Sequence, residues 1–205
     1  MTNKIVFTDF DGTYIKGDSY LMSLFFLGGW KRFIRNSGIF LLSVLEYSFN
    51  FITRNEVKRR SYELTYKNLN IDDININIER FVKKLRVFPQ VQNKIEELKA
   101  EGYKIIAVTA SPDIYMTYIS HRFGFDACIC TETERTGKML TGKLKRKNCN
   151  YSEKVRRIKE SDFYTEDSHI IALGNSRGDK QMLEFADEYY FVDTKGNLIK
   201  DKMPW

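Results

Sequence analysis

The chain has 205 residues, 42% hydrophobic and 29% charged, which is typical of one soluble globular core with room for a small insertion. Its net charge of +6 favours anionic partners such as acidic lipid, nucleic acid or a phosphorylated small molecule, although solubility alone would also explain it. Three cysteines without a CxxC pair and two histidines argue against a disulfide framework, a structural zinc site or a His-based catalytic triad.

The N-terminal residues 1–13 form a short apolar run followed at once by acidic residues, which is not the pattern of a signal peptide. We therefore expect a cytoplasmic protein. Basic residues are spread along the chain rather than clustered with aromatic ones, so nucleic-acid binding is the least favoured function.

Four short apolar runs predict buried strands, and helical patterns lie between them. The strands are expected at 5–7, 105–108, 170–173 and 189–192, and the helices at 90–101, 115–123 and 153–160. Strands that alternate with helices predict an α/β fold with a Rossmann-like, doubly wound parallel sheet. Two Thr-Gly-Lys turns within 133–145 predict a hairpin or flap.

The segment 14–87 shows no clear strand and has the pattern of several helices. It is too long for a simple crossover between two strands. We therefore predict a helical cap domain at 14–87, inserted into a core domain formed by 1–13 and 88–205.

Two apolar runs, 20–27 and 39–45, lie in the first half of this cap, with Lys31, Arg32 and Arg35 between them. Neither run reaches the roughly 18 apolar residues that a membrane span requires. They predict either a small core within the cap or an amphipathic surface that touches a membrane or a lipid substrate.

Asp9 and Asp11 directly follow the first predicted strand, where aspartate is otherwise unfavourable. Two carboxylates at one strand end suit Mg²⁺, which prefers hard oxygen ligands, and the Gly12-Thr13 turn can offer N–H groups to a phosphate. Calcium loops also contain Asp-x-Asp-Gly, but the later ligands of such a loop are missing here.

Polar residues also follow the second and third predicted strands. Thr109 can donate to a phosphoryl oxygen, whereas Ser111 before Pro112 fits the start of the next helix. Asn175 and Asp179 are oxygen ligands four residues apart, although an ordinary turn with a helix cap would have the same residues. Since the carboxyl ends of parallel strands share one edge of a sheet, these side chains are expected to converge with Asp9. Lys154 is a candidate to balance the resulting negative charge.

These motifs, in this order, resemble the haloacid dehalogenase (HAD) superfamily of phosphatases. The segments 9–13, 109, 149–155 and 174–179 are similar to its four motifs, and the helical insertion matches the place of its C1-type cap. Within the superfamily the chain looks closest to the HAD-IB subfamily, which contains phosphoserine phosphatase and the phosphatidylglycerophosphatase C group. Val108 to Pro112, Glu153 to Val155 and Ser176 to Asp179 are similar to the latter group.

The resemblance implies a Mg²⁺-dependent phosphomonoester hydrolase with an aspartyl-phosphate intermediate. Asp9 would be the nucleophile, Asp11 the general acid and base, and Lys154 a further catalytic residue. The metal ligands would be Asp9, Asp11, Asn175 and Asp179. Thr109, Ala110 and Lys154 would bind the phosphoryl group, and Asp18 and Arg59 would bind the rest of the substrate.

The family usually has Asp where this chain has Asn175, which keeps an oxygen ligand but removes a charge. Either Asp179 then takes the direct metal role, or magnesium binds more weakly and the protein is a weakly active, phosphate-binding regulator. The apolar cap and the net charge favour a lipid phosphate such as phosphatidylglycerophosphate, with peripheral contact at a membrane surface. The alternative is a small-molecule phosphatase of phosphoserine type.

Overall fold

The computed structural model describes residues 3–205, except for the side chain of Arg54. Internal contacts divide the chain into two compact units. The first contains the residues up to Asp18, Leu85–Thr131 and Cys149–Trp205, and the second contains Ser19–Lys84 and Glu132–Asn148.

A six-stranded sheet in the order β10-β9-β8-β1-β4-β5 organises the first unit. Five strands are parallel, and β10 pairs antiparallel with β9. Val6 of β1 lies opposite Ile105 of β4 and Ile171 of β8, so the first strand is central and buried on both sides. The strands are β1 (Lys4–Thr8), β4 (Lys104–Pro112), β5 (Ala127–Thr131), β8 (His169–Gly174), β9 (Glu188–Val192) and β10 (Leu198–Lys200).

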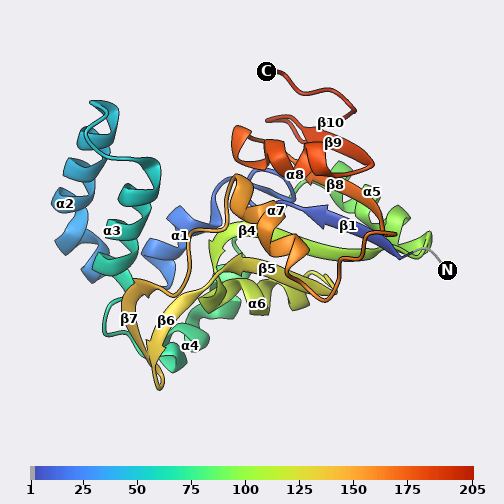
Figure 1. Ribbon diagram of the computed structural model, residues 1–205. Helices are drawn as coiled ribbons and strands as arrows, with labels where there is room; N and C mark the ends of the chain where they lie inside the picture. Colours follow the sequence, from blue (N-terminus) through green and yellow to red (C-terminus); the bar gives the residue numbers. More distant parts are fainter. Residues whose placement is uncertain (1–2) are drawn as a thin grey trace. The chain divides into compact units, whose positions relative to one another are not determined.

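Helices cover both faces of this sheet, as Figure 1 shows. On one face, Phe7, Val108 and Ala172 pack against Ile158 of α7 (Ser152–Lys159) and Met182 of α8 (Lys180–Phe185). The helices α5 (Pro89–Ala100) and α6 (Asp113–Arg122) contact β4. The predicted α/β, doubly wound fold is confirmed.

The chain order places a topological switch point beside β1. In the sheet, β1 pairs with β4 on one side and with β8 on the other. The next parallel strand along the chain, β4, thus lies on one side of β1, and the later strand β8 lies on the other. In such sheets the connections leave toward opposite faces, and the crevice between the carboxyl ends of the two strands is the usual ligand site. We therefore expect a functional site at the carboxyl ends of β1, β4 and β8.

Two short strands differ from the sequence prediction. Residues 14–87 were expected to contain no strand, but β2 (Ile15–Lys16) pairs antiparallel with β3 (Arg86–Val87). Strands of two residues are too short to produce a periodic pattern, so the sequence signal is weak. This pairing keeps residues 14–18 and 85–87 with the first unit, which differs from the predicted cap boundary.

Four helices and a hairpin make up the second unit. Its core contains Tyr20, Leu24, Tyr62, Tyr66 and Phe81, all buried. The elements are α1 (Ser19–Phe26), α2 (Trp30–Ser48), α3 (Arg54–Tyr66), α4 (Ile71–Val82), β6 (Thr133–Thr136) and β7 (Met139–Leu144). The structure thus contains the hairpin expected at 133–145, but groups it with the helical unit rather than with the predicted core domain.

Main-chain hydrogen bonds explain this grouping. The N–H groups of Asn68 and Ile71 donate to the carbonyls of Leu140 and Lys138, at 2.8 and 2.9 Å. Gly142 has φ +82°, and a Cβ there would lie 2.8 Å from Cβ of Lys67, so only glycine lets the hairpin approach α3 so closely. No helix within residues 3–205 has both the length and the apolar character needed to cross a membrane.

Candidate active site

The end of β1 carries the two aspartates of the first motif. The Asp9 N–H donates to the Leu173 carbonyl of β8 at 2.9 Å, which continues the sheet ladder and fixes the Asp9 backbone at the switch point. The Asp9 side chain is largely buried, and its Oδ2 accepts a hydrogen bond from the Thr13 hydroxyl at 3.1 Å. The apolar strand therefore positions a carboxylate at the sheet edge with little access to water.

Gly12 allows the chain to turn immediately after these aspartates. Its φ is +75°, and a Cβ there would lie 2.2 Å from Nδ2 of Asn175. A residue with a side chain would therefore be strained and would also displace Asn175. This close approach brings the Asn175 carboxamide, which follows β8, against the loop that follows β1.

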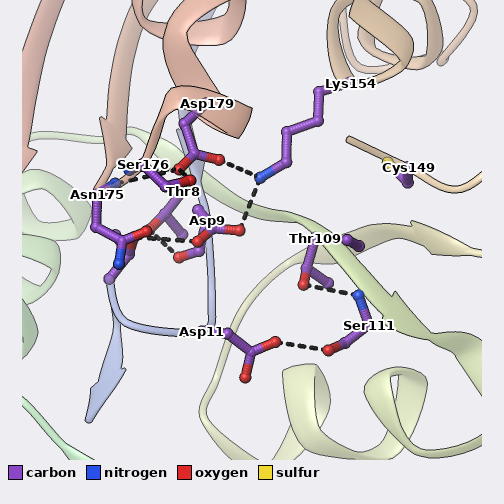
Figure 2. A network of polar contacts seen from close by, with 12 residues as sticks. Thr8, Asp9, Asp11, Thr109, Ser111, Cys149, Lys154, Asn175, Ser176 and Asp179 are labelled. Carbon is purple, nitrogen blue, oxygen red and sulfur yellow. Dashed lines mark hydrogen bonds and ion pairs between the residues drawn. The ribbon is translucent and has the colours of Figure 1, made fainter. Parts of the chain in front are cut away.

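Lys154 of α7 joins two of the predicted site residues. Its Nζ donates to Oδ1 of Asp9 at 2.7 Å and to Oδ1 of Asp179 at 2.6 Å, as Figure 2 shows. The lysine is only 2% exposed. Burial alone would lower the pKa of Lys154, but the carboxylates of Asp179 and Asp9 outweigh it and raise that pKa above its ordinary value. Lys154 is therefore held as a buried cation.

Asp179 has a largely structural set of partners. Its Oδ2 accepts hydrogen bonds from the Asn175 N–H at 3.2 Å, the Ser176 N–H at 3.0 Å and the Ser176 hydroxyl at 2.8 Å. With Ser176 it forms the capping box of the short 3₁₀ helix η1 (Arg177–Asp179). The sequence suggested either a helix cap or an oxygen ligand at this position. The Asp179 carboxylate forms the cap through Oδ2, while its Oδ1 accepts the hydrogen bond from Lys154.

Asp9 has an unusual charge environment. Burial, followed by repulsion from Asp179, raises the pKa of Asp9 to about 7, although Lys154 opposes the shift. Asp9, Asp11 and Asp179 bring three carboxylates to one edge of the sheet, against a single buried lysine. This excess of negative charge favours binding of a cation or a proton.

Thr109 and Ser111 lie near the carboxyl end of β4, where the pairing with β5 is irregular. The Thr109 Oγ1 accepts a hydrogen bond from the Ser111 N–H at 3.1 Å, and the Ser111 hydroxyl donates to Oδ2 of Asp11 at 2.5 Å. The cap assignment of Ser111 was wrong, because Pro112 occupies the cap position of α6 and no side chain caps that helix. Ser111 is a site residue that sequence analysis missed, although its spacing of two from Thr109 along an extended strand was a usable signal.

Oxygen atoms dominate the donor set at this edge. Among residues 3–205 no cluster of three His, Cys, Asp or Glu side chains forms a ready-made metal site. Asn175 supplies an additional carboxamide oxygen close to the Asp9–Gly12 loop. The negative charge that Lys154 does not neutralise and the hard oxygen donors at this edge of the sheet fit Mg²⁺.

The structure brings together most of the predicted site. Asp9, Asp179 and Lys154 contact one another directly, Asn175 packs on the Gly12 turn, and Asp11 bonds to Ser111, all within the first unit (Figure 2). Ala110 lies between Thr109 and Ser111, and its carbonyl accepts a hydrogen bond from the Thr131 hydroxyl at 2.7 Å.

The two predicted substrate-binding residues outside this network, Asp18 and Arg59, belong to different units. Asp18 follows β2 at the end of the first unit's N-terminal segment. Arg59 belongs to α3 of the second unit, where it pairs with Glu56 at 2.7 Å and Glu63 at 3.5 Å.

A doubly wound sheet with an aspartate pair at its switch point and a buried lysine defines a class of α/β hydrolytic enzymes. The chain belongs to the haloacid dehalogenase-like hydrolase family, whose model matches residues 6–184. This membership confirms the superfamily resemblance drawn from the motifs. Magnesium is the standard metal of that family.

Two known proteins are similar in sequence to this chain. Protein CicA of Caulobacter vibrioides is 29% identical over 192 residues, which cover 90% of this chain and 83% of CicA. A phosphoserine phosphatase of Archaeoglobus fulgidus is 24% identical over 111 residues, covering 53% of this chain and 32% of the relative. The family match and this relative support the expectation of a phosphatase.

Solved structures show the same fold. A protein of unknown function from Bordetella pertussis has a TM-score of 0.79 at 18% identity, covering 92% of this chain and 89% of the other. A phosphoserine phosphatase described as a phospho-aspartyl intermediate analogue has a TM-score of 0.58 at 20% identity, covering 92% and 86%.

Proposed function

We propose that the protein is a Mg²⁺-dependent phosphomonoester hydrolase that works through an aspartyl-phosphate on Asp9. One observation carries the proposal: the Asp9 carboxylate is fixed at the switch point between Lys154 and the Thr13 hydroxyl, with a second carboxylate two residues further on. In the solved phosphoserine phosphatase named for its phospho-aspartyl analogue, the same fold supports such an intermediate.

In the first step, a carboxylate oxygen of Asp9 attacks phosphorus, and the bond between phosphorus and the leaving oxygen breaks. Asp11 donates a proton to that oxygen, so the alcohol leaves neutral. In the second step, Asp11 takes a proton from water, whose oxygen attacks the acyl phosphate. Inorganic phosphate leaves and the Asp9 carboxylate is regenerated.

Three residues would hold the phosphoryl group. Lys154 neutralises part of its charge, and the Thr109 hydroxyl and the main chain at Ala110 donate to its oxygens. Because Thr109 Oγ1 accepts from the Ser111 N–H, its own hydrogen can point toward the substrate. Ser111 positions the Asp11 carboxyl group.

Asp9, the Asp11 carbonyl and Asn175 would hold the magnesium ion, which when bound supplies positive charge to the phosphoryl oxygens. Asp179 is the alternative ligand, but its Oδ2 accepts three hydrogen bonds within the η1 cap and its Oδ1 accepts one from Lys154, whereas each Asp9 oxygen accepts one. We therefore assign Asn175 the direct role and Asp179 the role of holding Lys154 in place. The raised pKa of Asp9 is consistent with a cation that keeps this group ionised near neutral pH.

We further propose a lipid phosphate as the substrate, of the phosphatidylglycerophosphate type, met at a membrane surface. The basic and apolar character of the second unit supports this choice. Asp18 and Arg59 are the proposed residues for the rest of the substrate, and Arg59 would have to exchange Glu56 and Glu63 for it. The phosphoserine phosphatase relative supports a small-molecule alternative.

A colorimetric assay with p-nitrophenyl phosphate and Mg²⁺ tests the reaction. A panel with phosphoserine, nucleotides, sugar phosphates and phosphatidylglycerophosphate then tests the substrate. We expect metal-dependent hydrolysis that Asp9→Asn abolishes and that the surface control Asp72→Asn leaves intact. Phosphate-ester binding without hydrolysis of any compound would instead identify a regulatory protein and contradict the proposal.

A further inference from the structure

On helix α2, the polar side chains of Arg32, Asn36 and Ser43 point into the second unit, beside the half-buried apolar residues Phe33, Phe40 and Val44. The Arg32 guanidinium donates to the carbonyls of Thr65 and Lys67 at 3.0 and 2.7 Å, and the Asn36 amide donates to the Leu64 carbonyl at 2.7 Å. Among the α2 side chains, all of which the structure describes, only Ser43 is buried. Much of the inward side is thus polar, whereas an ordinary surface helix buries its apolar stripe.

The outward side of α2 is apolar. Trp30, Ile34, Leu41 and Leu45 are 56%, 59%, 59% and 47% exposed. Their spacings of four, seven and four residues place them on one stripe along the helix. Leu42 widens the stripe, and the exposed Phe49 and Phe51 extend the apolar surface past the end of the helix.

Positive charge borders this stripe. Lys31 and Arg35 are exposed on α2, whereas the acidic residue between positions 19 and 52, Glu46, pairs with Arg60. An open groove of about 540 Å³ runs beside the helix. Four cationic side chains and one carboxylate line it, together with Ile39 of the helix: Arg32, Arg35, Arg60, Lys67 and Glu63.

We propose that this face of α2 is a membrane-binding surface that lies flat on an anionic phospholipid bilayer. The apolar stripe enters the boundary between headgroups and acyl chains, and the exposed Lys31 and Arg35 beside it meet headgroup phosphates. The inference deepens the proposed lipid-phosphate function and rests on it for the substrate, whereas the docking itself depends only on the second unit.

Charge decides between a bilayer and a second copy of the chain as the occupant. In a two-fold dimer through this stripe, α2 would offer Lys31 and Arg35 no countercharge, because its one acidic residue, Glu46, already pairs with Arg60. An anionic bilayer provides both the apolar depth and the countercharge that this helix lacks.

Flotation of the full chain with vesicles tests the surface. We expect partition to vesicles of equal phosphatidylglycerol and phosphatidylcholine, and at least about tenfold weaker partition to phosphatidylcholine alone. The double variant Ile34→Ser/Leu41→Ser should lose at least about tenfold in partition. The matched control Ile76→Ser, an isoleucine that is 76% exposed on α4, should bind as the wild type does.

Trp30 offers a direct optical probe, because the chain has two tryptophans. In the Trp205→Phe variant, anionic vesicles should shift the Trp30 emission to shorter wavelength. The Asp9→Asn variant should bind vesicles normally, so a failure of catalysis and a failure of docking give different results. Equal binding of wild type and the double variant, or a dimer in light scattering that the double variant dissociates, would overturn the proposal.

Discussion

The edge of the sheet at β1 and the exposed face of α2 depart from ordinary burial in opposite ways. At β1, charged groups lie inside: Lys154 and Asp179 are each 2% exposed and bonded to one another. At α2, large apolar groups lie outside while arginine and asparagine side chains pack inward. Both arrangements carry a physical cost, and they motivate the proposed phosphate-ester site and the proposed membrane surface.

Removing the carboxylate of Asp9 is the strongest test on the β1 side. Asp9→Asn should lower kcat for p-nitrophenyl phosphate by about 10⁴-fold or more, because the amide cannot form the covalent intermediate. Circular dichroism should remain that of the folded protein. Activity close to the wild-type value would remove Asp9 from the mechanism.

The buried lysine should matter for stability as well as for activity. Lys154→Met leaves Asp9 and Asp179 close together without a cation and should lower the free energy of unfolding by about 3–5 kcal/mol. Urea denaturation measures this loss. Lys159→Met, an exposed residue on the same helix, is the control and should cost less than about 1 kcal/mol. Adding Asp179→Asn to Lys154→Met should recover part of the loss, and no recovery would contradict the charge argument.

The pKa of Asp9 predicts a pH dependence of stability in metal-free buffer. Because the folded-state pKa is raised from 3.8 to about 7, the folded state binds this proton more tightly than the unfolded chain does. The stabilisation is complete below about pH 4 and is lost as pH rises through about 7. Relative to Asp9→Asn, the wild type should lose roughly 2–4 kcal/mol of unfolding free energy over this range. Parallel stability curves for the two proteins would refute the assigned shift.

Ser111 should give the smallest effect. Ser111→Ala removes the hydrogen bond to Asp11 and should lower kcat by about tenfold with little change in KM, because Asp11 is then held less precisely. Steady-state kinetics with a range of leaving groups measures it, and the deficit should grow for poor leaving groups. Ser120→Ala, a buried serine of α6 bonded to its own helix, is the control.

Much of the β1 region could be predicted from sequence, because its signals are local. Apolar runs that end in Asp9, Thr109 and Gly174 identify strands and their carboxyl ends, and parallel topology then brings those ends together. The role of Ser111 was missed, because the proline that follows it favoured a helix-cap interpretation over a contact with Asp11. The capping bonds of Asp179 use the same residues as a metal motif, so sequence alone could not separate the two.

The second unit was harder to predict, because its structure depends on contacts that local sequence patterns do not specify. An apolar run indicates burial but not what covers it. Tyr20, Leu24 and Leu27 of the first run pack into the core of the unit, whereas Leu41, Leu42 and Leu45 of the second run remain exposed. The structure groups the hairpin with the second unit through its bonds to Asn68 and Ile71, which are main-chain contacts that leave no side-chain pattern in the sequence.

Trapping the covalent intermediate tests the central claim most directly. The protein is mixed with excess substrate and Mg²⁺, quenched in acid, digested and analysed by mass spectrometry. We predict a phosphoryl group on the carboxylate of Asp9, sensitive to hydroxylamine and absent from the Asp9→Asn variant. Turnover with a phosphoryl group trapped on another residue, or with none trapped even when Asp11→Asn slows the second step, would contradict the account.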